Sequence, residues 1–97
     1  MSDKFLNHLL FCLGEECGEV QQVVGKSGRF GIYHLSPRTD KINLLNLKDE
    51  VTDLLAIYEM ICETLDEPKT LEESEIKKKK EKVMEYYTRM LNGEFKS

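Results

Sequence analysis

Three long stretches of the chain repeat apolar residues at the spacing of an α-helix, and this period constrains the fold more than any other feature. The stretches cover residues 3–24, 44–65 and 70–91. Both prolines, Pro37 and Pro68, lie between the stretches, where a helix-breaking residue is tolerated. A chain of 97 residues has room for one core only. We therefore expect residues 1–97 to form a single domain, an all-α helical bundle.

The segments between the stretches have the composition of connections. Gly25 is expected to end the first helix, and residues 25–43 to form a loop with a short helical turn beginning at Pro37. Such a loop is long for so small a domain, and long ordered loops are often functional. Thr70 and Glu73 have the spacing of a capping box, which predicts that the third helix begins at Thr70.

The second stretch is apolar on most of its circumference. A helix of this kind is usually covered by more than one neighbour. A chain this short buries only roughly 60–65% of its surface on folding, so one copy supplies limited cover. We therefore expect the bundle to be completed in a homodimer or a tetramer. The apolar face of this stretch includes Leu47, Val51, Leu54, Leu55, Tyr58, Ile61 and Leu65.

The charge and the cysteine content of the chain limit the kinds of partner and the cellular compartment that we expect. The chain has 14 basic and 18 acidic residues, a net charge of −4, and therefore no basic field to attract a nucleic-acid backbone. No apolar run is long enough to cross a bilayer. Cys12, Cys17 and Cys62 form no Cys-x-x-Cys pair, which favours a reducing compartment. We expect a cytoplasmic protein that binds neither nucleic acid nor membrane.

Four carboxylates fall on or beside apolar helix faces. With about 100° of rotation per residue, Glu16 projects into the apolar arc of the first helix and Glu19 to its edge. Glu50 and Asp53 project into the apolar arc of the second helix. Each pair is spaced i, i+3 and so shares one face, one turn apart. Glu15 points away from the arc.

Carboxylates gathered between helices require a positive partner. Burying one unpaired carboxylate costs several kcal/mol, on the order of the whole stability of a small domain. Magnesium favours carboxylates, water and substrate phosphates, and helix bundles build metal sites from inward carboxylates on facing helices. The pattern predicts a Mg²⁺ site, with Mn²⁺ as the alternative ion, held by Glu16, Glu19, Glu50 and Asp53. A single Glu-x-x-Glu is usually a solvated face, so the prediction depends on both pairs.

The same residues resemble a known signature. Glu15-Glu16-Cys17-Gly18-Glu19 followed by Glu50-Val51-Thr52-Asp53 is similar to the Glu-Glu-x-x-Glu … Glu-x-x-Asp motif of MazG-like nucleotide pyrophosphohydrolases, the all-α NTP pyrophosphatases. Gly25-Lys26-Ser27-Gly28-Arg29-Phe30-Gly31 resembles the Lys-x-x-Arg-Phe-Gly loop of small stand-alone members, many of them from phages and bacteria. The position of Asn43 also fits that branch, and the resemblance covers about Leu9 to Ile61.

The resemblance implies a hydrolase that splits a nucleoside or deoxynucleoside triphosphate into the monophosphate and pyrophosphate. It implies a four-helix-bundle assembly of two or four chains, with magnesium bound by the four acids named above. Lys26, Arg29 and Asn43 are the implied substrate contacts. Glu15 or Glu19 is expected to accept the proton of the attacking water.

Two other functions are consistent with the same residues. One is a helical module that binds a metal–nucleotide complex or a partner helix without turnover, since binding and catalysis use the same acids. The other is hydrolysis of a related pyrophosphate bond, as in dimeric dUTPases or phosphoribosyl-ATP pyrophosphohydrolases. The preferred base and sugar are not determined by these residues.

Overall fold

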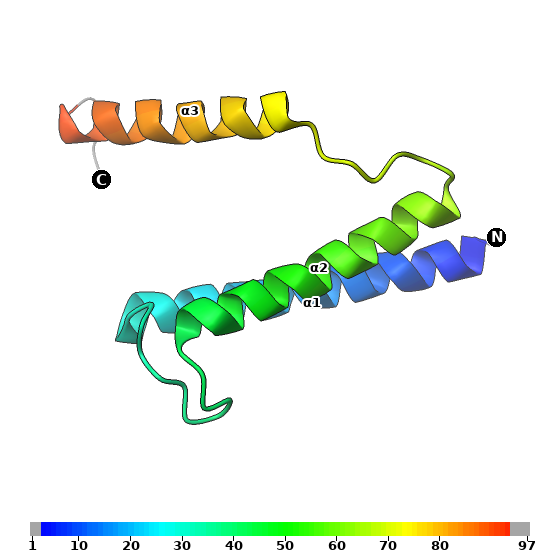
Figure 1. Ribbon diagram of the computed structural model, residues 1–97, viewed down its shortest axis with the longest axis horizontal. Helices are drawn as coiled ribbons and strands as arrows, with labels where there is room; N and C mark the ends of the chain where they lie inside the picture. Colours follow the sequence, from blue (N-terminus) through cyan, green and yellow to red (C-terminus); the bar gives the residue numbers. More distant parts are fainter. Residues whose placement is uncertain (1–2, 94–97) are drawn as a thin grey trace.

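The computed structural model describes residues 3–93 and consists of three α-helices and two connecting segments (Figure 1). The helices are α1 (Asp3–Phe30), α2 (Asn43–Thr64) and α3 (Glu73–Leu91). Within the described residues the single pairing of extended backbone is an isolated antiparallel bridge between Leu35 and Ile42. The predicted all-α class is confirmed.

The first helix is longer than predicted, because Gly25 does not end it. α1 continues to Phe30, and Gly31 follows with a φ of +104°, a conformation that favours glycine. The Gly31 N–H donates to the Ser27 carbonyl at 2.9 Å, which closes the last turn. A glycine inside a helix costs only about 1 kcal/mol relative to alanine, so Gly25 is tolerated within α1.

The predicted capping box at the start of α3 is wrong. The helix begins at Glu73, and the preceding residue, Glu72, has extended backbone angles of φ −74° and ψ 121° with no side-chain cap. Thr70 therefore lies two residues outside the position from which a hydroxyl could cap this helix. The short turn expected at Pro37 is present, and the Asp40 N–H donates to the Ser36 carbonyl at 2.8 Å.

The core is a two-helix hairpin. α1 and α2 run antiparallel side by side, joined at one end by the 31–42 loop (Figure 1). The fully buried apolar side chains among the described residues are Leu9 and Cys62, which are 2% and 6% exposed. The structure describes all three cysteines as free thiols. A core of this size covers only one stripe of each helix.

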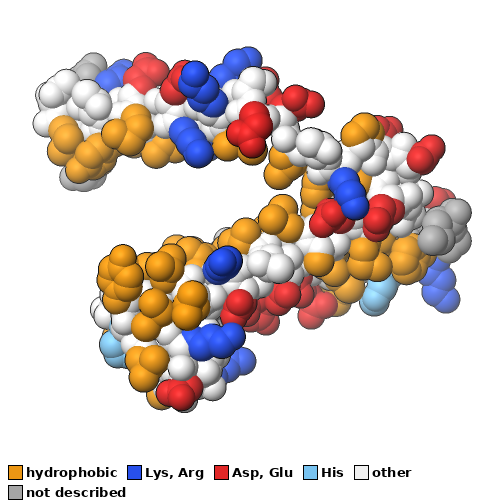
Figure 2. Space-filling view, in the orientation of Figure 1, with side chains coloured by type: hydrophobic (Ala, Val, Ile, Leu, Met, Phe, Trp, Pro, Cys, Tyr) orange, Lys and Arg blue, Asp and Glu red, His pale blue; other side chains and the backbone are white. Residues whose placement is uncertain are grey.

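The third helix stands apart from the hairpin. No close approach between α3 and either α1 or α2 occurs in the part of the chain that the structure describes, and every residue of α3 is exposed. Figure 2 shows a hydrophobic margin along α3 on the side that faces the hairpin, with open space between them. The apolar stripe of α3 includes Ile76, Val83, Tyr87 and Met90.

The surface and dimensions of the chain reflect this open arrangement. The accessible surface is 8025 Å², whereas a compact monomer of this mass is expected to expose about 5,700 Å². The radius of gyration is 17.2 Å, against about 12.5 Å for a compact domain of this length. None of the helices in the described range is both long and apolar enough to cross a membrane.

Candidate functional site

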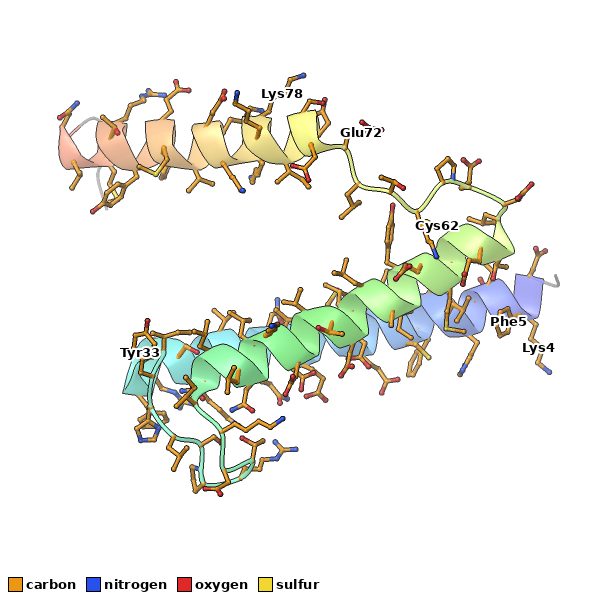
Figure 3. All side chains as sticks on the ribbon, viewed as in Figure 1. Lys4, Phe5, Tyr33, Cys62, Glu72 and Lys78 are labelled. Carbon is orange, nitrogen blue, oxygen red and sulfur yellow. The ribbon has the colours of Figure 1, made fainter. Side chains whose placement is uncertain are left out.

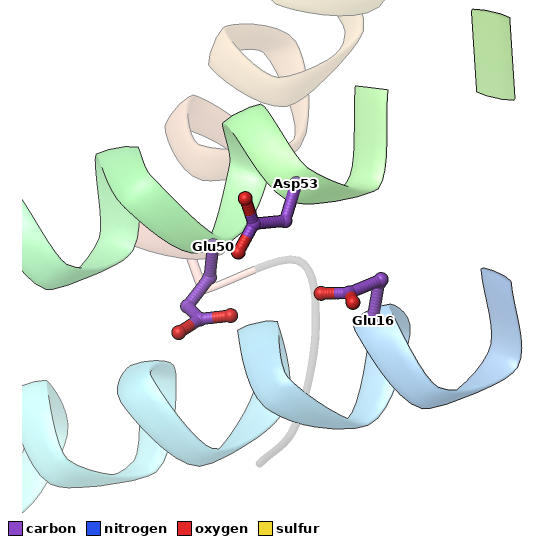
Figure 4. A group of neighbouring side chains, drawn as sticks. All are labelled: Glu16, Glu50 and Asp53. Carbon is purple, nitrogen blue, oxygen red and sulfur yellow. The ribbon is translucent and has the colours of Figure 1, made fainter. Parts of the chain in front are cut away.

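Three carboxylates from the two hairpin helices converge at its middle. Glu16 extends from α1 toward Glu50 and Asp53 on α2 (Figure 4), and one oxygen of each lies within 4.8 Å of the others. Opposed ligands of one Mg²⁺ are about 4.2 Å apart, since each Mg–O bond is about 2.0–2.1 Å. The three oxygens are therefore close to a spacing that one hard cation bridges. We call these three residues the acidic cluster.

The angular positions of the residues around each helix explain why the predicted site residues lie on one side of the hairpin. On α1, the Cα positions of Glu16, Glu19, Lys26 and Phe30 fall within an arc of about 80°. On α2, Asn43, Asn46, Glu50 and Asp53 fall within a similar arc. The local periodicity of each helix thus brings the predicted acids onto facing sides once the helices pair.

Burial of the acids is only partial. Glu16 and Glu50 are half-buried, whereas Glu19 and Asp53 are exposed. Glu19 was expected at the edge of the apolar arc, whereas the expectation that Asp53 lies inside the arc of the second helix is wrong within one chain, because its side chain is exposed. The physical reason is the absence of a third packed helix: α1 and α2 cover each other on one stripe, and the rim of that stripe faces solvent.

The surroundings of Glu50 disfavour its charged form. Burial raises the pKa of its carboxyl, and the nearby negative charges of Glu19, Asp53 and Glu16 raise it further. Like charges at this spacing destabilise the ionised cluster unless a cation neutralises them. The site therefore has the donor type, the spacing and the charge that suit a divalent cation.

A polar hollow of about 100 Å³ lies beside the acidic cluster, toward the loop. Three charged residues of the predicted site line this hollow: Glu19, Lys26 and Glu50. The loop adds Arg38, which was not among the predicted site residues although a short turn was expected to begin at Pro37. Figure 2 shows acidic side chains along the middle of the hairpin and basic ones nearer the loop. The hollow is therefore lined by both acidic and basic side chains.

The loop that places Arg38 is held by main-chain hydrogen bonds. The Ser36 N–H donates to the Lys41 carbonyl at 2.8 Å, and the Leu44 N–H donates to the Ile32 carbonyl at 2.8 Å. The Lys41 ammonium pairs with the Asp49 carboxylate at 2.9 Å on α2. These contacts hold the loop at the end of the hairpin, where Arg38 and Lys26 both line the hollow.

Asn43 is the most buried polar side chain of the described residues, at 2% exposure. Its side-chain amide donates to the Gly31 carbonyl at 2.9 Å, and its N–H donates to the His34 carbonyl at 3.0 Å. Asn43 also lines the polar hollow. The residue predicted to contact nucleotide thus ties the end of α1 to the start of α2 and presents one edge to the hollow.

Two predicted site residues do not line the polar hollow. Arg29 lies about 60° beyond the arc of Lys26 on α1, and its guanidinium sits over the Phe30 ring, 5.3 Å from the centroid. Glu15 is exposed and also lies outside the hollow, whereas Glu19 lines it. Of the two expected proton acceptors, Glu19 is the one beside Glu50.

Comparison of the chain with models of protein families, with curated proteins and with solved structures finds no match. Support for a function of this chain therefore comes from the geometry and chemistry of the residues described above and from the motif resemblance.

Proposed function

We propose that this protein is a magnesium-dependent nucleoside triphosphate pyrophosphohydrolase, which converts a (d)NTP to the (d)NMP and pyrophosphate. The observation that carries the proposal is the acidic cluster of Glu16, Glu50 and Asp53, which borders a hollow that is also lined by Lys26 and Arg38. Carboxylates suit the metal, and the two cations suit the phosphate oxygens. The motif resemblance is the basis for proposing that the bond between the α and β phosphates is cleaved.

Each group of residues has a distinct task in this proposal. The acidic cluster would hold Mg²⁺, with Glu19 at its edge, and the ion, when bound, would supply charge neutralisation and a more acidic water. Lys26 and Arg38 bind the phosphate oxygens and orient the chain of phosphates along the hollow. Glu19 lies beside the hollow, within reach of its solvent, and accepts a proton from the attacking water.

We further propose that the active form is a homodimer or tetramer. Support comes from the apolar surface of the single chain, which includes the stripe on α3 and the outer faces of α1 and α2. The excess exposed area of about 2,300 Å² exceeds the approximately 800 Å² that each partner contributes to a standard interface. The acidic excess of α2 and the basic excess of α3 also favour pairing between copies.

A substrate panel tests the proposal. Purified protein is incubated with Mg²⁺ and individual ribo- and deoxynucleoside triphosphates, dUTP and phosphoribosyl-ATP, and the products are identified by chromatography. Release of pyrophosphate from at least one nucleotide is expected, and Glu50→Gln should abolish it. Glu81→Gln on α3, which removes the same charge far from the cluster, should leave it unchanged.

Other outcomes of the panel identify the rival functions. Magnesium-dependent binding of nucleotide with no product after prolonged incubation indicates a non-catalytic nucleotide-binding module. Turnover restricted to dUTP or phosphoribosyl-ATP indicates the related activities. Full activity of the Glu50→Gln variant would show that the acidic cluster is not the metal site.

A further inference from the structure

A second hollow, of about 240 Å³, adjoins the polar hollow on the loop side. Its wall is mostly apolar and is formed by Phe30 at the end of α1 and by His34 and Pro37 in the loop. We call it the apolar hollow. Figure 3 shows this end of the hairpin, where the labelled Tyr33 stands on the loop beside the end of α1.

The two hollows share one wall. Lys26, Ser36, Arg38 and Asn43 line both of them. Taken together, the two volumes reach the lower end of the size range of small-molecule sites, about 300 Å³. The order of chemistry along the hairpin is therefore acids, then cations, then an apolar pocket.

The aromatic wall of the apolar hollow is held in place. The Phe30 and His34 rings have centroids 5.4 Å apart and planes inclined by 32°. The Arg29 guanidinium sits over the Phe30 ring, and the His34 N–H donates to the Gly31 carbonyl at 3.2 Å. Flat π-faces beside a cationic rim suit a flat heterocycle that bears phosphates.

We propose that the apolar hollow binds the nucleobase of the substrate, with Phe30 as the residue on which the base stacks. This inference rests on the proposed function, because the nucleotide lies with its phosphates on Lys26 and Arg38 and with its metal-bound end at the acidic cluster. The acids, the cations and the aromatic ring follow one another along the hairpin. A metal–nucleotide complex has its metal, its phosphates and its base in the same order. Stacking on Phe30 is tolerant of base identity, since every base has a π-face.

Calorimetric titration with two probes tests the base site without requiring turnover. The first probe is the Mg²⁺ complex of the α,β-imido analogue of each common deoxynucleoside triphosphate. The second is Mg²⁺–tripolyphosphate, which has phosphates and no base. Phe30→Ala should weaken binding of the nucleotide analogue by about 5- to 150-fold and leave tripolyphosphate binding unchanged. Phe30→Tyr keeps the ring and should restore binding.

Phe11→Ala is the matched control, because Phe11 is 67% exposed on α1 and lines neither hollow, whereas Phe30 is 57% exposed. Its binding of both probes should equal that of the wild type. Equal loss of both probes in Phe30→Ala, or no loss of either, overturns the base site. Pyrophosphate release with an unchanged KM in Phe30→Ala also overturns it and leaves the proposed function intact. Phe30-dependent binding without any product has the opposite meaning: the base site stands and the hydrolase proposal fails.

Discussion

Replacing Glu50 with glutamine should stabilise the metal-free protein and remove its response to magnesium. The two effects have opposite signs, and both follow from the acidic cluster. Glu50 is half-buried, with carboxylate oxygens of Glu16 and Asp53 within 4.8 Å. Glutamine keeps the size of the side chain and removes the charge, so the variant isolates the electrostatic contribution.

The magnitude follows from Coulomb's law. Two unit charges at 4.8 Å repel by about 0.9 kcal/mol in water. Two such neighbours give about 1.7 kcal/mol, and salt at 0.1 M reduces this to about 1 kcal/mol. One kcal/mol shifts the melting temperature of a domain of 60–100 residues by about 4–8 °C. We therefore expect Glu50→Gln to melt about 4–8 °C above the wild type in EDTA at pH 8.

Thermal melts followed by circular dichroism measure both effects at fixed protein concentration. Addition of millimolar Mg²⁺ should raise the melting temperature of the wild type and leave that of Glu50→Gln unchanged. Glu81→Gln should behave as the wild type does in both conditions. A lower melting temperature of Glu50→Gln in EDTA, or a magnesium shift equal to that of the wild type, would refute the assignment of Glu50 to a metal site.

Four further outcomes are expected. Arg38→Ala should raise the KM for nucleotide roughly tenfold through loss of a charge-assisted contact, whereas Lys48→Ala, which removes an exposed cation of α2 that lines neither hollow, should change it little, and steady-state kinetics separates the two. Asn43→Ala should lower the free energy of unfolding in urea by about 1–3 kcal/mol because it removes the buried amide that donates to the Gly31 carbonyl and ties the end of α1 to the start of α2, and an unchanged urea midpoint would contradict this. Because burial and neighbouring charges raise the pKa of Glu50, the folded metal-free protein holds that proton to higher pH than the unfolded chain. The melting-temperature difference between wild type and Glu50→Gln should therefore vanish below about pH 4.3 and grow as pH rises, and a difference independent of pH would argue against it. Sedimentation should detect a dimer or tetramer, and a strict monomer at high concentration would count against the proposed assembly.

The helices were predictable from sequence because their signal is local. Apolar spacing placed all three, and α2 differs from its prediction by one residue at each end. The predicted helix ends were wrong where the preference of a single residue or motif was overridden by the backbone conformation and hydrogen bonding around it. Gly25 was expected to end α1, but the helix continues to Phe30, and the Gly31 N–H closes its last turn. The capping spacing of Thr70 and Glu73 had no effect, because Glu72 is extended.

In the candidate site too, the features set by local helical geometry were predictable and those set by distant contacts were not. Helical phase predicted that Glu16, Glu50 and Asp53 would face one another, since phase depends only on position within each helix. Arg38 was missed because its place depends on the path of the loop, which is set by hydrogen bonds between residues distant from it. The degree of burial was overestimated because α3 does not pack on the hairpin of its own chain, and no local pattern reports on that.

Phosphorus NMR of a magnesium–nucleotide digest tests the central claim most directly. The preferred triphosphate is incubated with wild-type protein and Mg²⁺, and the ³¹P signals of all products are followed to completion. Cleavage between the α and β phosphates predicts monophosphate and pyrophosphate in equal amounts, with neither formed by Glu50→Gln or in EDTA. Diphosphate with inorganic phosphate, or a triphosphate spectrum that never changes across the nucleotide panel, would contradict the account.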